Sequence, residues 1–406
     1  MIKTIKLKSG ITLILEHMDE VRSTCIGIWC KTGSSNELPQ EEGISHFIEH
    51  MVFKGTKNRT AFQIVDEIDS IGGEINAFTG KEATCFYIKC LDEHFFKSCN
   101  VLTDLIENPL FSQEDIDKEK LVVIEEINMS MDDPDDVSLE RLETLVFAES
   151  KLSHAVLGSK ETVSSFDSES LRKYFDEHYT KESIIVSIAG SFDENAAVEY
   201  FEKHFVNLPE KARIDDKGQP MNLLQYDTIN RDIEQAHITL GVTTVPATDD
   251  NRYRLSMLST ILGGGMSSRL FQNVREKKGL AYSVYSMNGF YNCGGAFVIY
   301  AGVAKDRVQE ALEAIKEELD ILANNPIEER EYLSAREQLK SSYIFSQENV
   351  KSRMTTNGRN YLALGKCPSQ AEVLNMLDDI SIGDLESAKQ LICDYDKYSI
   401  VNVTGK

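Results

Sequence analysis

The segment GISHFIEHMVFKG, residues 43–55, places two histidines and a glutamate at a spacing that could bind a metal ion. On a helix, His46 and His50 point the same way, because residues four apart differ by about 40° around the axis. Two imidazoles so placed can reach one zinc ion. Glu49 falls on the same face, where a carboxylate can accept a proton from a water at the metal and pass it to a leaving amine.

The spacing HxxEH is the inverzincin signature, the reverse of HExxH. The alternative is a solvated helix face that carries two histidines by chance. A catalytic zinc also needs a third protein ligand and an open fourth position. Glu119 and Glu126 lie seven residues apart in EKLVVIEE and would share a helix face, so either could be a ligand while the other supports the site. Periodicity does not decide between them, and both could be surface carboxylates.

The elements around the motif are of mixed type. Residues 1–30 are expected to form a hairpin and a further strand, followed by helices at 44–54 and 61–73 and by two antiparallel strands around Gly80. Helices are expected at 93–107, 112–133 and 135–148, with a strand at 183–193 and a helix after it. Residues 207–231 are polar, contain two prolines and lack a sustained period, which is typical of a linker.

The second half of the chain repeats the pattern of the first in the same order, at an offset near 209 residues. The helix expected in LSMLSTILGGG occupies the place of the histidine helix but has no histidine. We therefore predict an α+β protein of two homologous halves, each an antiparallel-rich sheet packed with helices. The predicted domains are a metal-binding half (1–212), a linker (213–231) and a half without metal (232–406). LGGGMSSRLF (262–271) lacks the ending of a phosphate-binding loop and is interpreted as a turn between helices.

The composition narrows the class of partner. The chain has 406 residues and a formal net charge of −23, which argues against nucleic acid and anionic membranes and is compatible with basic peptides. None of the eight cysteines forms a CxxC pair, so they are expected to be buried thiols in a reducing cytoplasm. The first residues lack the apolar core of a signal peptide, and no apolar run is long enough to span a membrane.

GISHFIEHMVFKGT resembles the zinc motif of the pitrilysin/insulinase inverzincins, within the short two-domain group that includes the mitochondrial processing peptidase β-subunit and bacterial relatives. The resemblance covers nearly the whole chain. It implies a zinc endopeptidase that hydrolyses extended peptides or unfolded segments inside a chamber of two halves. Counted from His50, the glutamate ligand of the family falls on Glu126, with Glu119 in a supporting role. His46 and His50 would be the other ligands and Glu49 the base.

Two further segments match the family. GGEINAFTGKEAT resembles its substrate-binding edge strand, which implies that a peptide adds as a strand beside Asn76 and Ala77. REKKGLAYSVYS resembles the segment that supplies an arginine and a tyrosine to the cleft. The matching residues are Arg275, which would grip peptide carbonyls, and Tyr282, which would donate a hydrogen bond to the developing oxyanion.

The resemblance also implies that two chains pair, most simply as a homodimer and otherwise with a zinc-less homologous subunit. Two rival functions compete with the peptidase. One is a noncatalytic assembly subunit, against which the intact HxxEH motif argues. The other is a chaperone-like module that binds peptides without cutting them.

Overall fold

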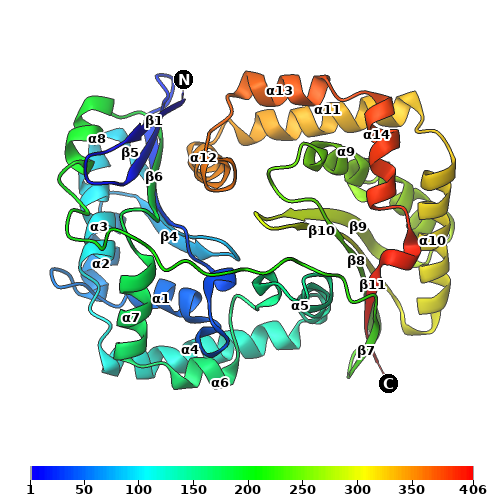
Figure 1. Ribbon diagram of the computed structural model, residues 1–406, viewed down its shortest axis with the longest axis horizontal. Coiled ribbons are helices and arrows are strands. Elements are labelled where there is room, and N and C mark those ends of the chain that lie inside the picture. Colours follow the sequence, from blue (N-terminus) through cyan, green and yellow to red (C-terminus); the bar gives the residue numbers. More distant parts are fainter. Residues whose placement is uncertain (1, 406) are drawn as a thin grey trace. The chain divides into compact units, whose positions relative to one another are not determined.

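The computed structural model describes residues 2–405 and divides into two compact units (Figure 1). The first unit contains the residues up to Asn128, His154–Asp216 and Phe345–Ser369. The second contains Met129–Ser153, Lys217–Ile344 and the residues from Gln370 on. Each unit has one sheet with helices on both faces, so the predicted α+β class is confirmed.

The sheet of the first unit has six strands in the order β1-β2-β6-β3-β5-β4. Their bounds are Ile2–Lys6 for β1, Thr12–His17 for β2, Ser23–Cys30 for β3, Glu74–Thr79 for β4, Thr84–Leu91 for β5 and Ile184–Gly190 for β6. All pairings are antiparallel except that of β2 with β6. The two predicted hairpins, β1–β2 and β4–β5, are both present, and β4 is the edge strand beyond β5.

One face of this sheet packs against helices that carry the larger core of the unit. These are α1 (Ile44–Val52), α2 (Ala61–Asp69), α3 (Phe95–Glu107), α4 (Gln113–Asp132), α6 (Lys160–Ser165), α7 (Ser168–His178) and α8 (Glu194–Phe201). A single helix, α12 (Val350–Leu364), packs on the other face against β3 and β6. Strands β3 and β6 are therefore buried on both sides, which explains why STCIGIWC and IIVSIAG are mostly apolar and do not alternate with charged residues.

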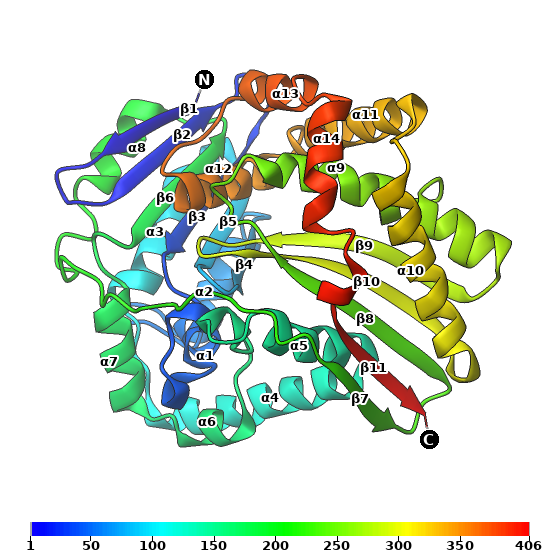
Figure 2. The ribbon, with the colours of Figure 1, turned by 45° about the vertical axis from the view of Figure 1, so that its right-hand side comes forward.

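The sheet of the second unit has five strands in the order β7-β11-β8-β10-β9 (Figure 2). Their bounds are Tyr226–Arg231 for β7, Gln235–Thr244 for β8, Ala281–Phe290 for β9, Gly295–Ala304 for β10 and Ser399–Gly405 for β11. The helices of this unit are α5 (Pro134–Val146), α9 (Asn251–Gly263), α10 (Val308–Asn324), α11 (Glu329–Ser346), α13 (Gln370–Asp378) and α14 (Ile382–Ala388), with the last residues of α11 assigned to the first unit.

The two sheets have the same topology, as expected for homologous halves. Strands β7, β11, β8, β10 and β9 occupy the places of β2, β6, β3, β5 and β4, and the single parallel pair recurs as β7 with β11. Part of the predicted linker is therefore a strand. The sequence of β7 shows little alternation of apolar and polar residues, because β7 is a short edge strand whose side chains are exposed or only half-buried.

Each sequence half contributes one helix to the sheet of the other half. Helix α5 packs on β8 and β11, and α12 packs on the corresponding strands β3 and β6 of the first unit (Figure 1). The compact units are therefore discontinuous along the chain and do not follow the predicted boundaries at residues 212 and 231. The order of elements along a sequence cannot show such an exchange.

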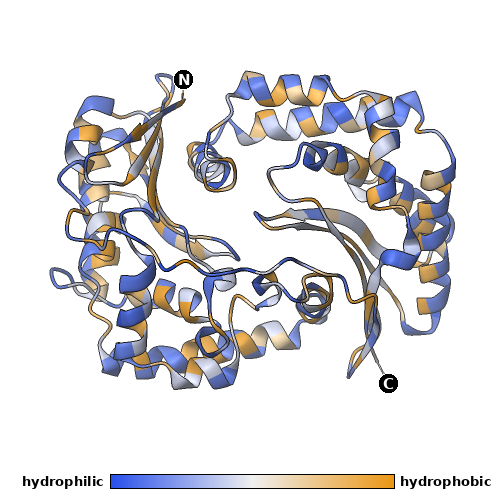
Figure 3. Ribbon diagram, viewed as in Figure 1, coloured by the Kyte–Doolittle hydropathy of each residue, from blue (hydrophilic) through white to orange (hydrophobic). Residues whose placement is uncertain are grey.

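Apolar and polar residues alternate around the helices, as expected for helices with one face on a sheet (Figure 3). All eight cysteines are free thiols. Six are buried, and Cys293 and Cys367 are half-buried. None of the helices described between residues 2 and 405 has the length and apolar content that a bilayer crossing requires.

Candidate active site

Helix α1 holds the HxxEH motif and is fixed in the first unit by its apolar face. Phe47, Ile48 and Met51 are fully buried against the core. The helix begins after Gly43, whose φ of 90° is in the left-handed region. A Cβ at Gly43 would lie 2.6 Å from the carbonyl oxygen of Leu157, so the chain can enter α1 in this way only with glycine.

The N-terminus of α1 is capped by a carboxylate from outside the helix. Glu37 is fully buried and accepts hydrogen bonds from the backbone N–H groups of Gly43 (2.8 Å) and Ser45 (2.9 Å). These are two of the N–H groups that a helix start leaves without an intrahelical partner. Burial raises the pKa of Glu37 to about 7, against the lowering effect of these hydrogen bonds.

Three potential ligand atoms meet beside α1. Glu126 of α4 places Oε2 3.5 Å from Nε2 of His50 and 3.7 Å from Nε2 of His46. Two ligands of a tetrahedral zinc ion, bound at about 2.0–2.1 Å, lie roughly 3.4 Å apart. The spacing and the N,N,O donor set therefore fit zinc. Among residues 2–405, these three are the one group of three or more histidine, cysteine, aspartate or glutamate side chains whose ligand atoms lie close enough together to share a metal ion.

The supporting glutamate lies behind His50. Glu119 Oε1 accepts a hydrogen bond from Nδ1 of His50 at 2.9 Å, which leaves Nε2 as the lone-pair nitrogen that faces Glu126. The other oxygen of Glu119 lies 2.5 Å from Nζ of Lys54. Burial raises the pKa of Glu119, but the bonds from His50 and Lys54 outweigh it and lower that pKa overall.

The two histidines differ in their electrostatics. Burial, with a smaller effect from His50, lowers the pKa of His46 to about 4, so His46 is neutral and its imidazole is available as a ligand. Burial also acts to lower the pKa of His50, but the hydrogen bond to Glu119 and the nearby carboxylates raise it overall. A bound dication would oppose protonation of both rings.

Glu49 stands on the same face of α1 as the two histidines and is half-buried. Its Oε2 accepts a hydrogen bond of 2.5 Å from the hydroxyl of Thr79 at the end of β4. Burial raises the pKa of Glu49, partly offset by Thr79 and His50. A carboxylate with a raised pKa is a better proton acceptor, as a general base requires.

The predicted substrate strand is an edge strand. Asn76 and Ala77 lie in β4, opposite Tyr87 and Phe86 of β5, and the other side of β4 has no strand partner among the described residues. The Asn76 side chain accepts a hydrogen bond from the N–H of Ala77 at 2.8 Å. The N–H of Ala77 is thus already bonded to a side chain, and the open side of β4 offers other backbone groups with which an added peptide strand could pair.

Arg275 and Tyr282 lie together in the second unit. Arg275 belongs to a π-helical segment, Phe271–Lys277, and its guanidinium carbon lies 5.6 Å from the ring centre of Tyr282 and 4.5 Å from that of Phe271. Tyr282 is 78% exposed. Their role toward a substrate stays a prediction.

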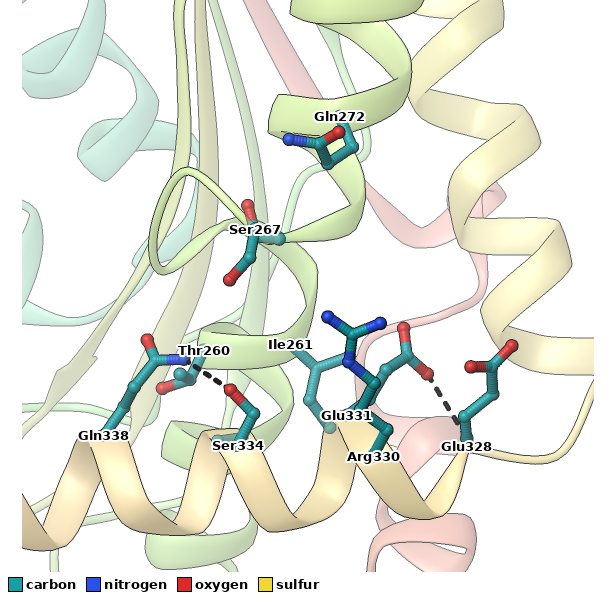
Figure 4. A pocket seen from close by; sticks show the side chains of 11 residues that line it. Thr260, Ile261, Ser267, Gln272, Glu328, Arg330, Glu331, Ser334 and Gln338 are labelled. Atoms are coloured by element: carbon teal, nitrogen blue, oxygen red, sulfur yellow. Dashed lines mark hydrogen bonds between the residues drawn. The ribbon is translucent and has the colours of Figure 1, made fainter.

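The segment LGGGMSSRLF is a turn between two helical segments, as predicted. It borders a polar cavity of about 460 Å³ that is also lined by Arg330, Ser334 and Gln338 of α11 (Figure 4). The carboxylates of Glu328 and Glu331 line the same cavity, and Glu331 is paired with Arg269. Two carboxylates would repel a phosphate group, so the cavity does not support phosphate binding by this segment.

Sequence reasoning did not single out Glu37, Lys54 or Thr79. Lys54 lies in GISHFIEHMVFKG and Thr79 in GGEINAFTGKEAT, but the carboxylates they contact, Glu119 and Glu49, belong to other elements. Only the position of Lys54, four residues after His50, could have suggested a neighbour of the site.

Comparison with known proteins agrees with the two-half organisation. Residues 12–160 match the model of the insulinase family, peptidase family M16, and residues 165–339 match the model described as the peptidase M16 inactive domain. The inactive-domain match includes α9, the helix that stands in the place of α1 and lacks histidine.

Full-length relatives and solved structures show the same relationship. The chain is 38% identical over 406 residues to an uncharacterized zinc protease, YmxG, of Bacillus subtilis. The alignment covers 100% of this chain and 99% of the relative. It is 39% identical over 387 residues to an uncharacterized zinc protease of Rickettsia felis, with 94% and 92% covered.

The fold superimposes on a protease from Helicobacter pylori with a TM-score of 0.93 at 20% identity, covering 100% of this chain and 99% of that one. It superimposes on a peptidase M16 inactive domain from Pseudomonas fluorescens with a TM-score of 0.91 at 17% identity, covering 100% of this chain and 98% of that one. The two family-model matches and the identity to relatives over almost the whole of both chains show that the chain belongs to the insulinase family of peptidases, peptidase family M16.

Proposed function

We propose that the protein is a zinc-dependent endopeptidase that hydrolyses extended peptides or unfolded segments. The observation that carries the proposal is the meeting of His46, His50 and Glu126 at distances that suit one zinc ion, with Glu49 on the same helix face. Membership of the insulinase family and relatives named zinc proteases support it.

When bound, zinc would polarise the scissile carbonyl and lower the pKa of a water molecule. Glu49 would accept a proton from this water on its carboxylate and later deliver it to the leaving amine. Glu119 would hold the ring of His50 through Nδ1, so that Nε2 keeps its lone pair for the metal. Glu126 is 41% exposed, so the centre is open to water and substrate on that side.

The peptide would lie as an added strand along β4, beside Asn76 and Ala77. Arg275 would bind carbonyl groups of the peptide, and Tyr282 would donate a hydrogen bond to the developing oxyanion. The support for these roles is the family resemblance, the free edge of β4, and the contact of the half-buried Arg275 with the exposed Tyr282.

A matched pair of variants tests the proposal. Glu49→Gln keeps the shape of the side chain but removes the base. Glu125→Gln changes an exposed neighbour of Glu126 whose side chain accepts a hydrogen bond from Asn128. We expect about one zinc per chain in all three proteins, loss of peptide cleavage in Glu49→Gln and normal cleavage in Glu125→Gln.

The measurement is metal analysis together with mass spectrometry of a digested peptide library. Cleavage that survives in Glu49→Gln would exclude the proposed base. Binding of peptides without cleavage by the wild-type protein would favour the chaperone-like alternative, and absence of zinc would favour the assembly subunit.

We also propose that the active form pairs two chains, most simply as a homodimer, and that it works in the cytoplasm. The eight free thiols support a reducing compartment, and the pairing rests on resemblance to the short members of the family. Light scattering of the purified protein at several concentrations tests the pairing, and a monomer at all of them would rule out the homodimer.

A further inference from the structure

The hydroxyl of Thr79 makes the contact that orients Glu49. Thr79 Oγ1 donates to Glu49 Oε2 at 2.5 Å, because a carboxylate can only accept. Across residues 2–405, this is the one hydrogen bond that the Glu49 side chain makes. A glutamate side chain has several rotatable bonds, so without this contact its oxygens could occupy more than one rotamer.

The hydroxyl of Thr79 has one close acceptor for its proton, the carboxylate of Glu49. It faces the hydroxyl of Thr84, its partner in the β4–β5 register, at 3.5 Å. Thr84 is fully buried and donates its own proton to the carbonyl oxygen of Thr32 at 3.0 Å. The single proton of Thr79 therefore goes to the much closer Glu49. The side chain of threonine is also stiff at χ1 because it is β-branched.

Thr79 lies on the strand that is proposed to bind the substrate. It is the last residue of β4, two positions after Ala77, and β4 is the edge of its sheet. One strand thus carries both the free edge for a peptide and the hydroxyl that holds the base. A peptide that adds to β4 would extend along the strand that fixes the direction of the Glu49 carboxylate.

We propose that Thr79 is a positioning residue, whose hydroxyl holds the Glu49 carboxylate in the orientation that takes a proton from water and ties that orientation to the substrate strand. The inference rests on the proposed function. General acid–base catalysis depends on the position of the catalytic group, and a displacement of about 1 Å can cost on the order of 100-fold in rate. Loss of this contact should therefore act on the chemical step rather than on peptide binding.

Valine and serine at position 79 separate the hydroxyl from the shape of the side chain. Thr79→Val keeps the β-branch and removes the donor, whereas Thr79→Ser keeps the donor. Thr228→Val, on the exposed face of β7 in the second unit, controls for the same exchange in a strand. We expect kcat to fall about 10- to 100-fold in Thr79→Val with KM and zinc content unchanged, and to stay within a few-fold of wild type in the other two.

A second measurement does not depend on activity. In crystal structures of the zinc-loaded proteins, the Glu49 carboxylate should occupy one rotamer in the wild type and in Thr79→Ser, and more than one in Thr79→Val. In the Glu49→Gln background, Thr79→Val should not lower any residual activity further, because the two residues act through one contact.

Each alternative outcome has its own meaning. If Glu49→Gln is inactive but Thr79→Val has the wild-type kcat, the Thr79 inference is wrong and the proposed function stands. If Thr79→Val loses zinc together with activity, the hydroxyl maintains the metal centre rather than the base, and the inference is again wrong. If Glu49→Gln remains active, the proposed function itself fails.

Discussion

Nδ1 of His50 lies 2.9 Å from Oε1 of Glu119, while Nε2 of the same ring lies 3.5 Å from Oε2 of Glu126. One imidazole thus stands between two carboxylates of the same helix, α4. The two carboxylates therefore have different roles. Glu119 fixes the ring of His50 through Nδ1, and Glu126 would bind the same metal ion as Nε2. This relationship yields the first prediction.

Three glutamine variants on α4 should separate these tasks. Glu126→Gln removes a ligand and should abolish tight zinc binding, whereas Glu119→Gln should weaken it about 10- to 100-fold, as is usual for loss of a residue that supports a ligand. Glu125→Gln should leave zinc affinity unchanged. Competition of each protein with a fluorescent chelator measures the affinity. Equal losses in Glu119→Gln and Glu126→Gln would contradict the division of roles.

Glu37 should make stability depend on pH. Its pKa is raised from an ordinary value of 4.5 to about 7 in the folded protein. Between these values the folded state holds a proton that the unfolded state has lost, so the free energy of unfolding should fall as pH rises from about 4.5 to about 7. The contribution is about 2–3 kcal/mol across that range, from about 1.4 kcal/mol per pKa unit.

Urea unfolding of the wild type and of Glu37→Gln at several pH values tests this. Both proteins should be stripped of metal with a chelator, because zinc binding has its own pH dependence. The variant should be less stable overall, since its amide cannot accept both N–H groups of α1. The decisive quantity is the slope with pH, and identical slopes in the two proteins would count against a protonated Glu37.

Helix α12 should depend on Gly358 for its place on the first sheet. A Cβ at Gly358 would lie 2.4 Å from the indole of Trp29, which is buried in β3. Gly358→Ala should therefore destabilise the protein by about 1–3 kcal/mol, although alanine is the better helix former. Gly383→Ala in α14 is the matched control, since its Cβ would meet only Ser381 Oγ at 3.6 Å.

Thermal unfolding of both glycine variants measures the difference. Gly383→Ala should keep or raise the unfolding temperature of the wild type, whereas Gly358→Ala should lower it. A neutral Gly358→Ala would mean that the exchanged helix is not closely packed on β3.

The net charge of −23 should favour basic substrates. At low ionic strength, a peptide rich in lysine and arginine should be cleaved with a kcat/KM several-fold above that of an acidic peptide of equal length, because opposite charge raises the rate of encounter. The ratio should shrink toward unity at about 0.5 M salt, where the screening length is roughly 4 Å. If the protein shows no preference for the basic peptide, or if salt does not change that preference, then the net charge does not determine its specificity.

The sequence by itself determined the parts of the site that depend on local geometry. His46, Glu49 and His50 share a face because the helical period alone places them there, and the apolar pattern of FIEHMV identifies the side that packs inward. The repeated order of strands and helices likewise predicted two halves with one topology, which the two sheets confirm. The sequence also showed that LSMLSTILGGG, the helix of the second half that corresponds to α1, has no histidine.

Only the tertiary structure decided what depends on contacts between elements. Glu119 and Glu126 share a face of α4, so their spacing could not tell which one meets Nε2 and which meets Nδ1; the packing of α4 beside α1 does. The bond from Thr79 to Glu49 joins residues 30 apart on a strand and a helix. The exchange of α5 and α12 between sheets also left no local trace, because an amphipathic helix has the same pattern whichever sheet it covers.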